Sequence, residues 1–186
     1  MAKIINMPLT EEVVNDLKAG DRVLLNGIIY TGRDAAHKRL AELIQKGQDL
    51  PMDIKNQTIY YVGPCPAKPG QVIGSAGPTT SGRMDAYAPL LMKHGLKGMI
   101  GKGLRSQQVV DSIIKNNAVY FAAIGGAGAL LAEAIKEAEV IAFPDLGAEA
   151  IYKLRVENFP VTVIIDNKGN DLYKLGKERY KIVVGR

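Results

Sequence analysis

Residues 21–31 read DRVLLNGIIYT, in which two apolar, β-rich runs flank the pair Asn26-Gly27. An Asn-Gly pair between such runs is the strongest short-range signal for a β-hairpin, because both residues tolerate the positive φ angles of a two-residue turn. This stretch therefore predicts that the fold opens with an antiparallel hairpin.

A helical pattern follows the predicted hairpin. Four apolar residues spaced i, i+4, i+7 and i+8 indicate an amphipathic helix that Asp34 can cap at its start and Gly47 can end. These apolar residues are Ala36, Leu40, Leu43 and Ile44.

Beyond residue 47, short apolar runs alternate with helical patterns, which is typical of an α/β fold. We predict strands at 58–62, 98–100, 118–124 and 161–165, and helices at 85–94, from 106 and at 127–138. Pro89 fits its helix only if that helix begins close before it. Together with the antiparallel hairpin, the alternation predicts a mixed sheet in a single domain that spans residues 1–186.

The composition of the chain limits its partners. Its 186 residues carry 24 Lys+Arg against 19 Asp+Glu, a net charge of +5, with ordinary globular content of 47% hydrophobic and 23% charged residues. No Lys/Arg block is present, so we expect a small anionic ligand and no nucleic acid.

The start lacks the apolar segment of a signal peptide, and the longest charge-free stretch, 116–132, is short and glycine-rich. We therefore expect a cytoplasmic protein without a membrane span.

The chain also has few residues that bind soft metals. One cysteine, Cys65, and two histidines are too few for a zinc or iron–sulfur site made by this chain alone, so we expect it to hold no metal. Cys65 has no histidine near it in sequence and is predicted to be a small packed side chain. His37 fits either a general base or phosphate carrier, or a buried, hydrogen-bonded structural residue, and the sequence favours the structural role.

Three segments contain glycine together with cationic or hydroxyl side chains, and each lies where a predicted strand precedes a predicted helix. They are TGRD at 31–34, GPTTSGRMD at 77–85 and GKG at 101–103. In open α/β folds, ligands bind at the carboxyl edge of the sheet, where helix N-termini also attract anions. We expect these three segments to converge on one site, although no known nucleotide-binding motif fits them.

The side chains of these segments suit a small dicarboxylate or a phosphate. Arg33 and Arg83 carry planar forks that match a carboxylate, and Lys102 is a compact positive charge. Thr79 and Thr80 offer hydroxyls in a stretch free of charge. Two simpler interpretations remain open: the middle segment is only a turn that caps the next helix, and each cation taken alone is an ordinary surface residue.

Five segments in order resemble a known family. They are TGRDAAHKRL at 31–40, YYVGPCPA at 60–67, GPTTSGRMD at 77–85, GMIGKG at 98–103 and FPVTVIIDNKGNDLY at 159–173. From about Leu9 onward the chain resembles the beta subunit of class I (iron–sulfur) fumarate hydratase and of its relative L(+)-tartrate dehydratase.

The resemblance implies a swivelling β/β/α domain and a hydro-lyase of the tricarboxylic acid cycle that reversibly hydrates fumarate to L-malate. It implies a [4Fe–4S] cluster ligated by a separate alpha subunit and none bound by this chain. It further implies an alpha2beta2 heterotetramer, and it leaves a homodimer open for the isolated chain.

The family's pocket residues match Arg33, Thr79, Arg83 and Lys102, and we add Thr80 as a further substrate-binding residue. Thr79, Arg83 and Lys102 are expected to be catalytic: the cations stabilise the negative charge that builds beside a carboxylate, and Thr79 moves a proton. Tartrate is an equally open substrate. A phosphohistidine-type swivelling domain, which would use His37, and a non-catalytic anion-binding subunit are two further functions that the sequence leaves open.

Overall fold

The computed structural model describes residues 1–179 and 181, and its centre is a seven-stranded mixed sheet in the order β1-β2-β3-β4-β5-β7-β6. The strands are β1 (Lys3–Asn6), β2 (Arg22–Thr31), β3 (Thr58–Tyr60), β4 (Gly98–Gly101), β5 (Val119–Ala122), β6 (Ile135–Ala142) and β7 (Ile151–Ile165). The α-helices are α1 (Glu11–Asp16), α2 (Asp34–Gln45), α3 (Ala88–Lys93), α4 (Gln107–Lys115), α5 (Gly128–Glu133) and α6 (Leu172–Arg179), and two 3-10 helices are η1 (Ser81–Met84) and η2 (Pro144–Glu149).

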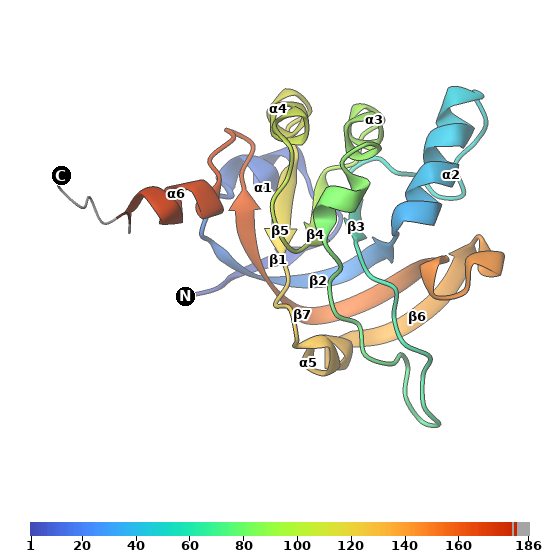
Figure 1. Ribbon diagram of the computed structural model, residues 1–186. Coiled ribbons are helices and arrows are strands. Elements are labelled where there is room, and N and C mark those ends of the chain that lie inside the picture. The colour runs from blue at the N-terminus through green and yellow to red at the C-terminus, as the bar shows by residue number, and fades with distance from the viewer. Residues whose placement is uncertain (180, 182–186) are drawn as a thin grey trace.

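The sheet closes on itself through β2. This strand pairs in parallel with β3 and antiparallel with β7, while β3, β4 and β5 run parallel and β5 also pairs with β7. Figure 1 shows β2, β7 and β6 crossing below β3–β5, with α2, α3 and α4 side by side above them. The fold is therefore mixed α/β with two strand layers and one helical layer.

Each strand layer contributes to an apolar core. Tyr60 and Phe159 belong to the core between the two strand layers, where their rings meet edge to face at 5.3 Å between centroids. Tyr61, next to Tyr60, belongs instead to the core beneath the helices, because successive residues of an extended chain point to opposite faces. Tyr120 of β5 also lies in this second core, which adjoins the predicted site.

The predicted N-terminal hairpin is wrong. Residues 22–31 form one continuous strand, and Asn26-Gly27 lies at a β-bulge where the register with β7 shifts. Gly27 has φ 113°, so the positive φ that a turn requires is used by a bulge instead. The antiparallel partner of β2 is β7, far along the chain, and the Asn158 N–H donates to Asn26 Oδ1 at 2.9 Å.

The helix predicted from Asp34 is confirmed as α2, with Gly47 at φ 64° just after it. Asp34 is its first residue and not its cap, because Arg33 occupies the N-cap position without a side-chain hydrogen bond. Pro89 lies in the first turn of α3, as its ring requires.

The helix predicted at 127–138 is wrong in its second half. It ends at Glu133, and β6 begins at Ile135, where pairing with β7 makes the chain extended. In the described part of the chain, no helix has the length and apolar character needed to cross a membrane.

Candidate functional site

Two of the three predicted segments are joined by backbone hydrogen bonds beyond the ends of β3 and β4. The Lys102 N–H donates to the Thr79 carbonyl at 3.2 Å, and the Ser81 N–H donates to the Lys102 carbonyl at 2.9 Å, so that Thr80 and Lys102 form a short parallel bridge. The Thr79 N–H donates to the Tyr61 carbonyl at 2.8 Å. The structure thus brings Thr79, Thr80 and Lys102 together.

Arg83 connects this pair of loops to the third segment. Its Nη2 lies 2.6 Å from Oδ2 of Asp34, the first residue of α2, and the Arg83 side chain is 53% exposed. Because Arg33 is the residue before Asp34, the ion pair places both arginines at the same edge of the molecule.

Arg33 is the more enclosed of the two arginines. Its Nη2 lies 3.2 Å from Oε1 of Glu149 at the end of η2, while Glu149 Oε2 accepts a hydrogen bond from the Ala35 N–H. The Arg33 Nε is buried without a partner in the structure. A Cβ at Gly63 would lie 2.9 Å from Arg33 Nη1, so the glycine leaves room for the guanidinium.

Lys102 is exposed, and it makes no ion pair with the part of the chain that the structure describes. Its aliphatic stem passes the glycine turn after β5: a Cβ at Gly125 would lie 3.6 Å from Lys102 Cδ. The ammonium is therefore available to an anion at the edge where Thr79 and Thr80 lie.

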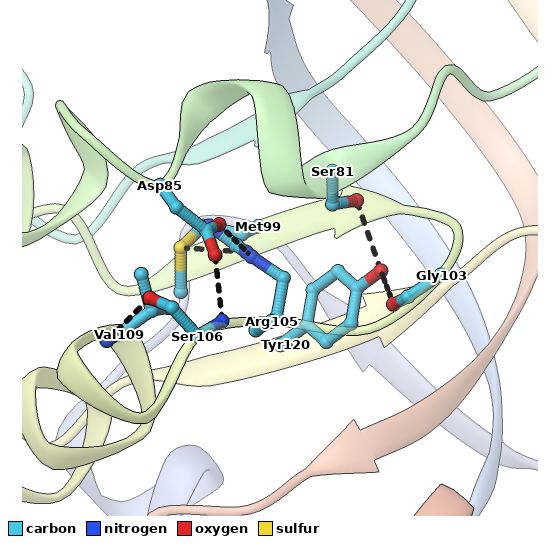
Figure 2. Close-up of polar contacts among 8 residues, drawn as sticks. All are labelled: Ser81, Asp85, Met99, Gly103, Arg105, Ser106, Val109 and Tyr120. Carbon is cyan, nitrogen blue, oxygen red and sulfur yellow. Dashed lines mark hydrogen bonds and ion pairs between the residues drawn. The ribbon is translucent and has the colours of Figure 1, made fainter.

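A buried polar network lies behind these loops (Figure 2). The Tyr120 hydroxyl lies 2.9 Å from both Ser81 Oγ and the Gly103 carbonyl oxygen. The Arg105 Nε donates to Asp85 Oδ1 at 2.7 Å, and the Ser106 N–H donates to Asp85 Oδ2 at 2.6 Å.

Two contacts at this edge were not predicted from the sequence. Glu149 lies beyond β6, whose first residues fall within the helix predicted at 127–138, and no prediction from the sequence placed Glu149 near Arg33. Tyr120 looked like an ordinary apolar strand residue, since its hydroxyl partners lie on loops 17 and 39 positions away in the chain.

The structural role predicted for His37 is confirmed. The side chain is fully buried, and its Nδ1–H donates to the Arg33 carbonyl at 3.0 Å, since a carbonyl can only accept. Burial lowers the pKa of His37 to about 4, so the ring is neutral at physiological pH. A buried neutral ring does not fit an exposed phosphate carrier.

The packed position predicted for Cys65 is wrong, because its thiol is free and exposed. Its backbone pairs with Gly74 and Ser75, and these hydrogen bonds join the two ends of the loop that extends between them. No group of three or more His, Cys, Asp and Glu side chains able to hold a metal ion occurs among residues 1–179 and 181. The described residues therefore do not fit an iron–sulfur cluster, and the chemistry they offer is anion binding by cations and hydroxyls.

Comparisons with known proteins show which family this chain is similar to. The family model described as "Fumarase C-terminus" matches residues 2–176. "Fumarate hydratase class I, anaerobic" of Escherichia coli is 45% identical over 174 residues, which are 91% of this chain and 32% of the relative. "Fumarate hydratase 2" of Leishmania major is 45% identical over 156 residues, 83% of this chain and 28% of the relative.

A third relative has nearly the same length as this chain. "Putative L(+)-tartrate dehydratase subunit beta" of Methanocaldococcus jannaschii is 39% identical over 172 residues, 89% of this chain and 88% of the relative. The chain thus spans about a third of the first two relatives and most of the third. With a match that covers nearly all its residues, the chain belongs to the Fumarase C-terminus family.

Proposed function

We propose that this chain is the substrate-binding beta subunit of a class I fumarate hydratase, a hydro-lyase that adds water reversibly to fumarate to give L-malate. The observation that carries the proposal is the convergence of Arg33, Thr79, Arg83 and Lys102 at one edge of a Fumarase C-terminus domain. Relatives named fumarate hydratase support the reaction class.

In this proposal the cations bind the two carboxylates of the substrate. Arg33 and Arg83 each have unpaired guanidinium N–H groups beyond those that face Glu149 and Asp34, and a planar fork fits a carboxylate. Lys102 stabilises the negative charge that develops on the carbon beside a carboxylate during addition of water, an effect that is largest when water is excluded.

Thr79 transfers the proton at that carbon. A threonine hydroxyl is a weak acid, so its alkoxide needs nearby positive charge, and Lys102 is bridged to the adjacent Thr80. The hydroxyl of Thr80 is a second hydroxyl that binds the substrate.

The remainder of the enzyme is proposed to come from an alpha subunit in an alpha2beta2 complex. A relative named as a beta subunit has this chain's length, whereas the E. coli relative contains the same region as a third of a longer chain. We assign the [4Fe–4S] cluster to the alpha subunit, and no step above passes through it. The assignment of the fold to the swivelling β/β/α type and a cytoplasmic location remain predictions.

A second substrate is favoured by one observation. The relative of matching length carries the name of a tartrate dehydratase subunit, so L(+)-tartrate is the alternative acid. Comparing kcat/KM for the two acids decides between them.

The test of the proposal is anaerobic mixing of this chain with its alpha subunit, followed by the loss of fumarate absorbance. We expect Arg83→Ala to lower kcat/KM by roughly 100-fold or more, because a charged contact to a substrate carboxylate is lost. Arg155→Ala is the matched control, since Arg155 pairs with Glu137 of β6 and Glu157 of β7, strands that carry none of the proposed site residues. Turnover of neither acid by the wild-type complex, or full activity of Arg83→Ala, would overturn the proposal.

A further inference from the structure

The candidate residues lie on two loops whose relative position must be fixed for catalysis. Thr79 and Thr80 precede η1, whereas Lys102 follows β4, and reacting groups displaced by about 1 Å lose much of their rate. Backbone hydrogen bonds between Thr79, Ser81 and Lys102 join the two segments directly, and a buried side-chain contact behind them would restrict their relative movement further.

Tyr120 supplies a contact of this kind. It is 0% exposed, and the Arg105 guanidinium lies over its ring at 4.9 Å from the centroid. From β5, its side chain reaches both loops, as Figure 2 shows, with Ser81 on one side of the hydroxyl and Gly103 on the other.

The direction of the two hydrogen bonds follows from their chemistry. A carbonyl oxygen can only accept, so the Tyr120 O–H donates to Gly103, and the Ser81 O–H must donate to Tyr120 Oη. Burial raises the pKa of Tyr120 well above its usual range, so the phenol remains a donor throughout the neutral range. The Tyr120 hydroxyl therefore connects Ser81, which follows Thr80, to Gly103, which follows Lys102.

A second connection fixes the other end of η1. Asp85 is held by the Arg105 Nε and by the N–H of Ser106, the N-cap of α4. The segment from Ser81 to Asp85, which contains Arg83, is thus tied at both ends to the segment from Gly103 to Ser106. Only the Tyr120 connection lies beside Thr79 and Lys102.

We propose that Tyr120 is a positioning residue whose hydroxyl sets the separation of Thr79 and Lys102; this inference rests on the proposed hydratase function. It does not touch the substrate and acts through the two loops. Loss of the Tyr120 hydroxyl should mainly disturb proton transfer by Thr79 and charge stabilisation by Lys102. Binding of the substrate carboxylates by Arg33 and Arg83 should change less.

The first test is steady-state kinetics of Tyr120→Phe in the complete alpha–beta complex. We expect kcat to fall roughly tenfold to 100-fold, while KM changes by less than about threefold. Tyr60→Phe is the matched control: Tyr60 is also 0% exposed and donates to a backbone carbonyl, that of Ala76. We expect Tyr60→Phe to retain kcat within about twofold.

Ser81→Ala removes the same connection from the other loop and tests the proposal even if Tyr120→Phe folds poorly. It should lower kcat in the same direction. A kcat within twofold of wild type in both variants, or an equal loss in Tyr60→Phe, would overturn the positioning role.

The second test separates this inference from the proposed function. Amide hydrogen exchange of the isolated chain reports the Ser81 and Lys102 N–H groups, both of which are bonded across the two loops. We expect their exchange to be at least about tenfold faster in Tyr120→Phe and unchanged in Tyr60→Phe. An inactive wild-type complex would refute the hydratase assignment, whereas unchanged exchange would refute the connection itself.

Discussion

Arg33 and Arg83 each face a carboxylate of their own chain before any substrate binds. Glu149 holds one guanidinium and Asp34 the other, at 3.2 Å and 2.6 Å. Both pairs are partly exposed, so each contributes about 1 kcal/mol or less to stability. Their main effect is to limit how the side chains swing while leaving N–H groups for a ligand.

His37 makes the stability of this chain depend on pH. Its folded pKa is lowered to about 4 by burial, whereas the ring in the unfolded chain protonates near its ordinary pKa of 6.5. Between these values the unfolded state binds more protons, so stability is highest above pH 6.5 and is lost as the pH falls toward 4. We expect this residue to account for a loss of about 2 kcal/mol in the free energy of unfolding between pH 7 and pH 4.5, and urea unfolding at the two pH values would measure it.

The control for this prediction is His37→Asn, which keeps an N–H near the Arg33 carbonyl and has no titrating group. Carboxylates that titrate in the same range affect both proteins. We expect the wild type to lose more stability than the variant between the two pH values. An equal loss in both would show that His37 does not drive the dependence.

At the scale of elements, the end of β4 shows why a glycine is present beside the candidate site. All four of its residues are buried, and a Cβ at Gly101 would lie 1.9 Å from Ser81 Oγ and 3.0 Å from Tyr61 Cδ2. The glycine thus allows η1 to approach the end of β4 closely. The close packing of η1 against β4 therefore depends on the absence of a side chain at position 101.

Gly101→Ala is therefore expected to destabilise the protein by about 1–3 kcal/mol, because the added methyl overpacks a buried contact. Denaturant unfolding measures this change. Gly176→Ala in α6 is the control, since no atom of the described residues outside the neighbouring helix backbone lies within 4 Å of its Cβ position, and it should leave stability unchanged or slightly raised. Equal stability of Gly101→Ala and wild type would contradict this account.

Local chemistry predicted some elements well and others poorly. Helix α2 was predictable, because the spacing of its apolar residues and the glycine that ends it, Gly47, are both local features of the sequence. The bulge at Gly27 was not, since a positive φ suits a turn and a bulge alike and only the distant strand β7 decides between them. The three site segments were visible from their glycines and cations, but the contacts of Glu149 and Tyr120 depend on β6 and on the closed sheet.

At the scale of the whole molecule, β7 holds the two strand layers together. It pairs with β2 along most of that strand, and also with β5 and β6. Phe159 on β7 is 0% exposed, lies opposite Leu25 and meets the Tyr60 ring. These contacts join β7 to residues that lie far from it in the sequence.

Phe159→Ala should lower the free energy of unfolding by about 3–5 kcal/mol, because it opens a cavity in the core between the layers. Ile4→Ala on β1 is the comparison, since Ile4 is 69% exposed and its loss should change stability by about 0.5 kcal/mol or less. Urea unfolding followed by circular dichroism measures both. A loss for Phe159→Ala no larger than that for Ile4→Ala would argue against this role of β7.

The late position of β7 in the chain affects how the protein is made on the ribosome. When residues up to Ala122 have emerged, β2 and β5 have been synthesised, but the strand that pairs with both has not. Their unpaired backbone groups then form open edges that invite association with other nascent chains. A message truncated before codon 151 would yield a polypeptide with those edges permanently exposed, a natural client for molecular chaperones.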